Sequence, residues 1–277
     1  MIPVSRSSEG YRIPFRSLVP FLLITFGIAW GILTLYILLP DVMTGAFGRL
    51  TGEHPLFFLA VYSPAIAAVI IVAFRTGTSG VRNFLSRVLL WRCPAPWYLF
   101  LIAGIPLLFY IGAAMKGALS GGEYSLPAFK SLIVPLLLTI VKGPVEEFGW
   151  RGLALPLLQR RFAPVWAGLV LGIIWGFWHL PAFLLSGTPQ GAWSFTPFFI
   201  GSVAVSVIMT GVFNASRGSI LLPALFHFQF NNPIWPDAQP YDMYPIIVAA
   251  AAIVWIDRRT MFGKEKGVTR VIAAAQK

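Results

Sequence analysis

The sequence predicts an all-α membrane protein with about eight transmembrane helices, and three observations support this fold class. Hydrophobic residues make up 57% of the 277 residues and charged residues only 11%, whereas a soluble domain carries about 25% charged residues. Apolar runs of the length that a spanning helix needs, about 20 residues, recur along the chain. Basic residues gather in alternate connecting segments. We therefore expect one membrane-embedded domain over residues 1–277, with lipid around most of its surface.

Eight apolar segments are predicted to form the helices of this bundle. The fourth is long and carries charged residues, and the seventh is short for a spanning helix. In chain order, the segments are residues 17–39, 55–74, 95–114, 131–159, 164–185, 196–214, 218–231 and 243–256.

The basic residues predict how the bundle is oriented. If the N-terminus is cytoplasmic and the segments alternate, the opposite side holds only Arg49, Lys116 and Lys130. This split follows the positive-inside rule and predicts cytoplasmic N- and C-termini in a cell membrane. It also predicts that the seventh segment crosses, because otherwise the basic C-terminal tail would lie outside. The cytoplasmic segments would hold sixteen basic residues: Arg6, Arg12, Arg16, Arg75, Arg82, Arg87, Arg92, Arg160, Arg161, Arg217, Arg258, Arg259, Lys264, Lys266, Arg270 and Lys277.

Composition excludes several function classes. The net charge of +11 follows from membrane topology, so we expect the lipid bilayer as a partner and no nucleic acid. The single cysteine, Cys93, excludes an intramolecular disulfide and a multi-thiolate metal site. The sequence contains no Gly-rich phosphate loop, no His-Glu-x-x-His zinc helix and no convincing serine or cysteine nucleophile.

A few polar residues lie inside the predicted helices, where an ionisable group is costly and therefore indicates function. From the cytoplasmic helix ends, a rise of 1.5 Å per residue places Glu146 and His179 about 21–22 Å deep and His227 about 14 Å deep. Three helices thus deliver a carboxylate and two imidazoles to the middle part of a hydrocarbon core of about 30 Å. The full set is Lys142, Glu146, Glu147, Arg151, His179, His227 and Asn231.

Spacing within these helices predicts two pairs. Glu147 and Arg151 are four residues apart and share a helix face, so they can form an ion pair that leaves Glu146 on a different face. His227 and Asn231 are also four apart and can present two polar groups to one point.

This combination of side chains suits the hydrolysis of an acyl or peptide bond. A carboxylate can take a proton from water, and imidazole and carboxamide N–H groups can stabilise the oxyanion that forms on the attacked carbonyl. A dry, apolar environment strengthens both effects. Gly143 and Pro144 could open the helix beside Glu146 and admit water, or could be ordinary membrane-helix residues. His179, just before a proline, could instead satisfy a freed backbone carbonyl.

Three motifs resemble those of the CAAX prenyl endopeptidase and bacteriocin-processing family. Residues 146–151, Glu-Glu-Phe-Gly-Trp-Arg, match its Glu-Glu-x-x-x-Arg motif. Residues 175–179, ending in His179, resemble Phe-x-x-x-His, and residues 227–231 match His-x-x-x-Asn. The motifs occur in order in successive apolar segments within residues 141–231. Trp175 replaces the usual phenylalanine, a change expected to affect packing more than chemistry.

The resemblance implies an eight-helix intramembrane protease and assigns roles to its residues. Glu146 would be the general base, His179 would help to hold the water, and His227 with Asn231 would form the oxyanion hole. Glu147 and Arg151 would support them. In an alternative reading, Glu146, His179 and His227 would bind a zinc-like ion with water in the open position. We favour the metal-free mechanism, without a cofactor, because Asn231 suits a hydrogen-bond donor better than a zinc ligand.

Other functions remain alternatives at this point. A multi-pass transporter also uses midplane charges and broken helices, although the sequence shows no pair of matching halves. A non-enzymatic bacteriocin-immunity protein would not need Glu146, and a pair of histidines can bind heme. The family's name implies cleavage after a C-terminal prenylated cysteine, so we expect a peptide or prenylated-protein substrate, reached from the cytoplasm or the bilayer. The sequence does not identify the physiological substrate.

Overall fold

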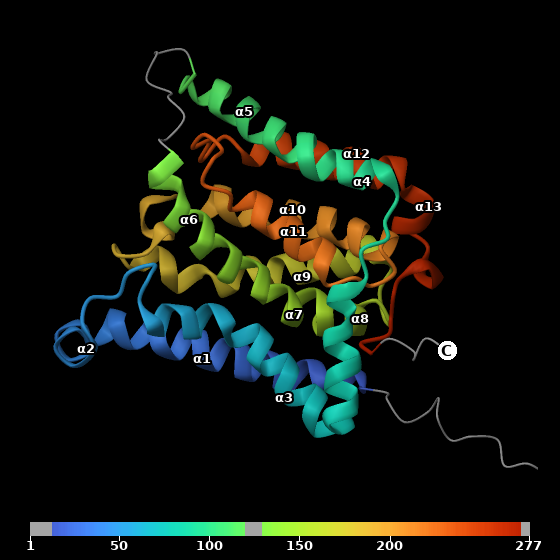
Figure 1. The fold of residues 1–277 in the computed structure, drawn as a ribbon, viewed down its shortest axis with the longest axis horizontal. Coiled ribbons are helices and arrows are strands. Elements are labelled where there is room, and N and C mark those ends of the chain that lie inside the picture. The colour runs from blue at the N-terminus through green and yellow to red at the C-terminus, as the bar shows by residue number, and fades with distance from the viewer. Residues whose placement is uncertain (1–12, 120–128, 273–277) are drawn as a thin grey trace, which may run out of the picture.

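The computed structural model describes residues 13–119 and 129–272, and in this part of the chain the fold is helical with no β-strand (Figure 1). All eight predicted segments contain helix, so the all-α prediction is confirmed. The main helices are α1 (Leu18–Leu38), α2 (Pro40–Phe47), α3 (Pro55–Leu85), α4 (Ala95–Leu99), α5 (Ile105–Lys116), α6 (Phe129–Val141), α7 (Glu147–Gly149), α8 (Leu155–Leu158), α9 (Pro164–Trp178), α10 (Phe195–Ala215), α11 (Leu221–Phe230), α12 (Met243–Ile256) and α13 (Arg258–Met261).

Five helical stretches in the described part of the chain are long and apolar enough to cross a membrane. Two further apolar helices, α11 and α12, are shorter. The polytopic architecture is therefore confirmed, although not every predicted segment spans a bilayer as one helix. The five stretches are Phe15–Leu38, Pro55–Leu89, Ala95–Lys116, Pro164–Leu184 and Phe195–Ala215.

The surface of the bundle is apolar where a soluble protein would be charged. Leu23 of α1 is 68% exposed, and Val248 of α12 is exposed to the same extent. In contrast, Glu147 and Arg151 are fully buried inside. This distribution fits a protein whose solvent is lipid, because exposed leucine and valine cost nothing in hydrocarbon and charged groups must be paired inside.

Small residues allow the central helices to pack closely. Gly168, Gly172 and Gly176 are spaced four residues apart on α9 and face α10. A Cβ atom on Gly172 would lie 2.8 Å from the Cα atom of Val203, so only glycine permits this approach. Close backbone contact between small residues is a main source of helix association in membranes. Helix α10 also packs against α12, and α1 packs against α3.

Helix α3 consists of two helical pieces joined at a kink. The sequence predicts a helix that ends at residue 74, and Gly77, with non-helical dihedral angles (φ 67°, ψ −168°), interrupts the helix three residues later. A second helical piece, which the sequence did not predict, then continues to Leu85. Such a φ favours glycine, because it lacks the Cβ atom that would clash.

The fourth predicted segment, 131–159, is not one continuous helix, which corrects the prediction. Helix α6 ends at Val141, and Lys142 has non-helical dihedral angles (φ −87°, ψ −80°). A 3-10 turn, Gly143–Glu146, follows, then α7, then a π-helical turn, Trp150–Ala154, and α8. Pro144 explains the break, because proline lacks the N–H that would continue the helix and its ring clashes with the preceding turn. The predicted opening beside Glu146 is therefore present.

The seventh segment is also shorter than predicted. Helix α11 covers only Leu221–Phe230, which at 1.5 Å per residue spans about 15 Å, half of a hydrocarbon core. Its C-terminal end therefore stops inside the bundle, and the chain continues as a loop, residues 231–242, that returns to α12.

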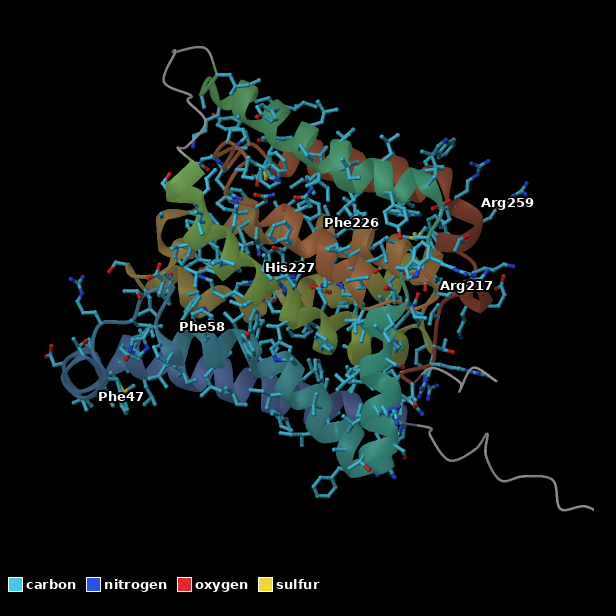
Figure 2. All side chains as sticks on the ribbon, viewed as in Figure 1. Phe47, Phe58, Arg217, Phe226, His227 and Arg259 are labelled. Carbon is cyan, nitrogen blue, oxygen red and sulfur yellow. The ribbon has the colours of Figure 1, made fainter. Side chains whose placement is uncertain are left out.

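The described basic residues of the predicted cytoplasmic segments lie at one end of the bundle. Figure 2 places Arg217 and Arg259 at this end and Phe47 at the opposite end. We call this end the basic face; it consists of the start of α1 together with residues 75–94, 159–163, 216–220 and 257–272.

The C-terminal segment is fastened across the basic face by buried polar side chains. Gln159 Nε2 donates to the carbonyl of Val268 at 2.9 Å, and Asn214 Oδ1 accepts from the N–H of Val268 at 2.9 Å. Arg87, which is 2% exposed, donates to the carbonyl of Val271 at 2.7 Å. These bonds close the bundle at this end.

The contact between α7 and α3 can be tested at Gly149. A Cβ atom here would lie 2.5 Å from the carbonyl oxygen of Pro64, so Gly149→Ala should lower the free energy of unfolding by about 1–3 kcal/mol. Gly27→Ala on α1 is the matched control, because nothing lies within 4 Å of its new Cβ atom. Thermal unfolding in detergent should show a lower melting temperature for Gly149→Ala only; equal values for both variants would contradict the packing.

Candidate active site

The broken fourth segment brings the first motif against α11. Glu146 ends the 3-10 turn and is only 4% exposed. A Cβ atom added to Gly143 would lie 2.7 Å from Nδ2 of Asn231 and 2.8 Å from Nε2 of His227. Glycine is therefore required at this position, and the two nitrogens of the third motif converge on the start of the turn that carries Glu146.

Glu147 is the buried carboxylate that joins the first motif to the third. Its Oε1 atom accepts a hydrogen bond from Nη1 of Arg151 at 3.1 Å and one from Nδ1 of His227 at 2.7 Å. The predicted Glu147–Arg151 pair is present, and the structure adds His227 as a second partner that spacing did not reveal. Because a carboxylate oxygen only accepts, Nδ1 of His227 carries a proton and Nε2 is the nitrogen that lies beside Gly143.

Arg151 is held in the π-helical turn, Trp150–Ala154. Its guanidinium carbon lies 4.8 Å from the centroid of the Trp175 ring, a cation–π contact. This contact and the ion pair with Glu147 together compensate a cation that is fully buried. π-Helical turns occur frequently at functional sites, and here the turn carries the last residue of the first motif.

Trp175 connects the three motifs. Its indole Nε1 donates to Oε2 of Glu146 at 2.9 Å. Its ring lies edge-on to both imidazoles, with centroid distances of 5.5 Å to His179 and 5.4 Å to His227. A phenylalanine has no N–H to give to Glu146, so the structure adds a polar contact that the sequence did not predict.

His179 lies where α9 ends, and its orientation is fixed from one side. Its Nδ1 atom is 2.8 Å from the carbonyl oxygen of Trp175. A carbonyl only accepts, so Nδ1 carries the proton and Nε2 is free to accept one. The backbone N–H of His179 bonds to Gly176 instead of Trp175, so this imidazole does satisfy a freed carbonyl, as one reading of the sequence proposed. That bond sets the tautomer and leaves Nε2 for chemistry.

Asn231 is the asparagine that faces the site. It caps the end of α11 and is exposed. The neighbouring Asn232 is already engaged, because its Nδ2 donates to Gln229 at 2.8 Å and its Oδ1 accepts from the N–H of Ile234 at 3.1 Å. Asn232 therefore shapes the loop after α11, which leaves Asn231 as the carboxamide of the third motif.

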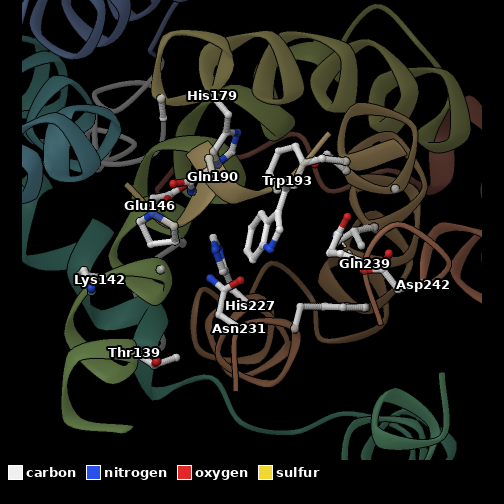
Figure 3. A pocket seen from close by; sticks show the side chains of 18 of the residues that line it. Thr139, Lys142, Glu146, His179, Gln190, Trp193, His227, Asn231, Gln239 and Asp242 are labelled. Carbon is white, nitrogen blue, oxygen red and sulfur yellow. Dashed lines mark hydrogen bonds between the residues drawn. The ribbon is translucent and has the colours of Figure 1, made fainter. Parts of the chain in front are cut away.

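A cavity of about 550 Å³ brings these side chains together. Glu146, His179, His227 and Asn231 all line it (Figure 3). Glu147 and Arg151 are fully buried and are not among the lining residues. Lys142 lines the cavity too. The remaining wall is largely apolar and aromatic. The predicted set of seven is thus divided into five residues that line the cavity and two, Glu147 and Arg151, that do not.

The arrangement fits a zinc-type site poorly. In residues 13–119 and 129–272, no three His, Cys, Asp or Glu side chains are grouped closely enough to hold a metal ion. One imidazole, His227, is turned to Glu147, and Glu146 is bonded to an indole N–H. We therefore derive no chemical step through a metal.

Fold and site together define the class of this protein: a multi-pass helical membrane protein with a buried carboxylate, two imidazoles and a carboxamide around a central cavity. These side-chain types, their place inside membrane helices and the order of the three motifs along the chain are those expected of a membrane-embedded hydrolase.

Two comparisons with known proteins agree with this class. The family model described as type II CAAX prenyl endopeptidase Rce1-like matches residues 128–232, which contain all three motifs. The chain is also similar to CAAX prenyl protease 2 of Methanococcus maripaludis, with 27% identity over 251 residues that cover 80% of this chain and 90% of the relative. The predicted resemblance to the CAAX prenyl protease family is therefore confirmed.

The role of Trp175 can be tested by Trp175→Phe, which keeps an aromatic ring and removes only the indole N–H. A hydrogen bond to a charged group contributes about 1.5–3 kcal/mol, so peptide hydrolysis should fall by roughly 10- to 150-fold if that bond orients Glu146 in the transition state. Trp193→Phe, at a residue that lines the same cavity, is the matched control and should retain activity. Full activity of Trp175→Phe would show that packing alone matters.

The role of Glu147 can be separated from simple charge pairing. Glu147→Gln leaves the buried Arg151 without a counter-charge and should cost about 3–5 kcal/mol of stability. The double variant Glu147→Gln/Arg151→Met removes both charges and should regain much of that stability. Because His227 still lacks its carboxylate, hydrolysis should stay low in both. Recovery of activity in the double variant would show that Glu147 serves Arg151 only.

Proposed function

We propose that this protein is an intramembrane endopeptidase of the CAAX prenyl protease type, in which Glu146 activates the attacking water. The observation that carries the proposal is the convergence of Glu146, His179, His227 and Asn231 on one cavity inside an apolar bundle. Neither a transporter nor an immunity protein needs this set, and the family match adds independent support.

Glu146 supplies the base. One of its oxygens is held by Trp175, which fixes the carboxylate while leaving it able to accept a proton from water. His179 presents an unprotonated Nε2 to the same cavity. This nitrogen accepts a hydrogen bond from the second O–H of that water. The water oxygen attacks the peptide carbonyl carbon, and its proton passes to Glu146.

The third motif supplies the oxyanion hole. Nδ2 of Asn231 and, in its protonated form, Nε2 of His227 donate to the carbonyl oxygen as it becomes negative. Glu147 accepts a hydrogen bond from Nδ1 and so holds the orientation of the ring. When the tetrahedral intermediate collapses, the C–N bond breaks and Glu146 returns its proton to the leaving amine. The products are a carboxylic acid, which keeps the second hydrogen of the water, and a free amine, so atoms and charges balance.

The proposal also covers the substrate of the protein and the orientation of its termini in the membrane. The relative is named a CAAX prenyl protease, which supports a peptide bond next to a C-terminal prenylated cysteine as the first candidate. The aromatic and aliphatic wall of the cavity suits a lipid-modified peptide. The distribution of basic residues supports cytoplasmic N- and C-termini in a cell membrane.

Cleavage by the purified protein tests the proposal. Wild type in detergent is given a fluorescent farnesylated CAAX peptide, alone and with a strong chelator. We expect cleavage that Glu146→Ala and Glu146→Gln both abolish, and that chelator does not reduce. Asp41→Asn, which removes an exposed carboxylate on α2, is the matched control and should cleave at the wild-type rate.

Other outcomes are equally informative. Loss of cleavage in chelator, with recovery on adding zinc, would replace the water-activating role of Glu146 with metal binding by Glu146, His179 and His227. Cleavage that survives Glu146→Gln would contradict the proposed base. Absence of cleavage by folded wild-type protein would contradict the CAAX-type activity.

A further inference from the structure

A second group of polar side chains lines the active-site cavity apart from the catalytic residues. Gln239 and Asp242 belong to the loop that precedes α12, and both line the cavity. In the view of Figure 3 they lie together on one side of Trp193, and Glu146 lies on the other side. Neither residue belongs to the three sequence motifs, so the chemistry described above does not use them.

Asp242 is a buried carboxylate with one oxygen unused. The residue is 7% exposed, and its Oδ2 accepts a hydrogen bond from Nε2 of Gln239 at 2.9 Å. The other oxygen, Oδ1, is buried and has no hydrogen-bond partner among the described residues. Asp242 directly precedes α12, yet its side chain makes no capping hydrogen bond to that helix. A buried acceptor without a donor costs free energy, which a ligand with N–H groups can recover.

Gln239 adds a second acceptor of the same kind. Because its Nε2 is used on Asp242, its Oε1 is the free end of the amide, and this oxygen is also buried without a partner in the part of the chain that the structure describes. Ser202 of α10 lines the cavity as well. A Cβ atom on the neighbouring Gly201 would lie 3.8 Å from Cβ of Met243, so this part of α10 lies beside the start of α12. Acceptors from two elements therefore meet on this side of the cavity.

The carboxylate of Asp242 also lacks a counter-charge within residues 13–119 and 129–272. Asp237, by contrast, is paired with Lys116 at 2.7 Å. Lys142 is the one lysine or arginine among the described lining residues, and it donates to the carbonyl of Gly52 at 3.1 Å. Burial raises the pKa of Asp242 to about 6, although the nearby backbone N–H groups of Met243 and of Asp242 itself favour the charged form. At neutral pH this wall of the cavity is therefore negative.

We propose that Asp242 and Gln239 form a binding subsite for a basic side chain of the substrate peptide, a lysine or an arginine. Ammonium and guanidinium groups carry several N–H donors and no acceptor, so one such group can satisfy both unpartnered oxygens. Hydrogen bonds between a cation and a carboxylate are among the strongest in proteins. Because the subsite and Glu146 share one cavity, the basic residue lies at a fixed number of positions from the scissile bond. The subsite sets specificity and takes no part in bond breaking. The inference rests on the proposed peptidase function.

Kinetics with matched peptides test the subsite. Each farnesylated CAAX peptide of a set carries lysine at one position near the prenylated cysteine, and norleucine, which is uncharged and of similar length, at the others. We expect one position at which lysine lowers KM by about 10-fold or more relative to the all-norleucine peptide. Asp242→Asn should remove this preference, and Gln239→Met should weaken it. Asp237→Asn, which removes another cavity-lining carboxylate, is the matched control and should keep the preference.

Binding without cleavage separates the subsite from the peptidase activity. In Glu146→Gln protein, fluorescence anisotropy should show tighter binding of the lysine peptide than of the norleucine peptide, and the double variant Glu146→Gln/Asp242→Asn should bind both equally. Melting temperatures in detergent establish that each variant is folded. Equal KM and equal affinity for all peptides would overturn the subsite, and so would a preference that survives in folded Asp242→Asn. Absence of cleavage by wild type would contradict the peptidase instead, while the affinities would still decide whether Asp242 binds a cation.

Discussion

The structure depends on the buried carboxylate of Glu147, which binds two partners at once. In a hydrocarbon environment the charges of Glu147 and Arg151 cannot be left unpaired, because water is not there to solvate them. The carboxylate of Glu147 meets Arg151 and His227 with the same oxygen. Pairing the charges of the fourth segment therefore also fixes the position of α11, which carries His227. The same carboxylate that neutralises the buried Arg151 orients a catalytic imidazole.

Trp175 extends this arrangement to the remaining groups. Its N–H, its ring face and its ring edge serve different partners: Glu146, the guanidinium of Arg151, and the two imidazoles. A single rigid side chain that contacts four polar groups limits how far any of them can move. Such preorganisation is what makes hydrogen-bond donors and bases effective in a site from which water is largely excluded.

The sequence predicts the helical class, the positions of the helices and the members of the site, because each has a local signal. Apolar runs mark helices, and polar residues inside them mark function. Glu147 and Arg151 follow from a four-residue spacing. The bond between Glu147 and His227 could not be predicted, since it joins residues 80 positions apart and depends on the angle between two helices. The role of Trp175 was missed because the sequence shows an aromatic residue, not the direction of its N–H.

The points where helices break also show which features have a local sequence signal and which depend on tertiary contacts. Pro144 signals a break in the fourth segment, but not that a 3-10 turn and a π turn would follow on either side of α7. Helix α11 ends at Phe230, within one residue of the predicted end, and Pro233 follows shortly after it, as is common beyond a helix C-terminus. Its start is three residues later than predicted. The loop after the helix, in which Asn232 bonds to Gln229 and Ile234, depends on contacts that are not visible in hydropathy.

The wall formed by α12 has a consequence for the surrounding lipid. This helix has 14 residues, about 21 Å at 1.5 Å per residue, against a hydrocarbon core of about 30 Å. Val248 and Trp255 on it are exposed, so lipid meets an apolar surface that is shorter than the hydrocarbon core, a mismatch relieved by thinning of the bilayer, by snorkelling of flanking residues or by association with another chain. Ile246, on the same helix, lines the cavity. A single short helix therefore lies between the cavity and the lipid.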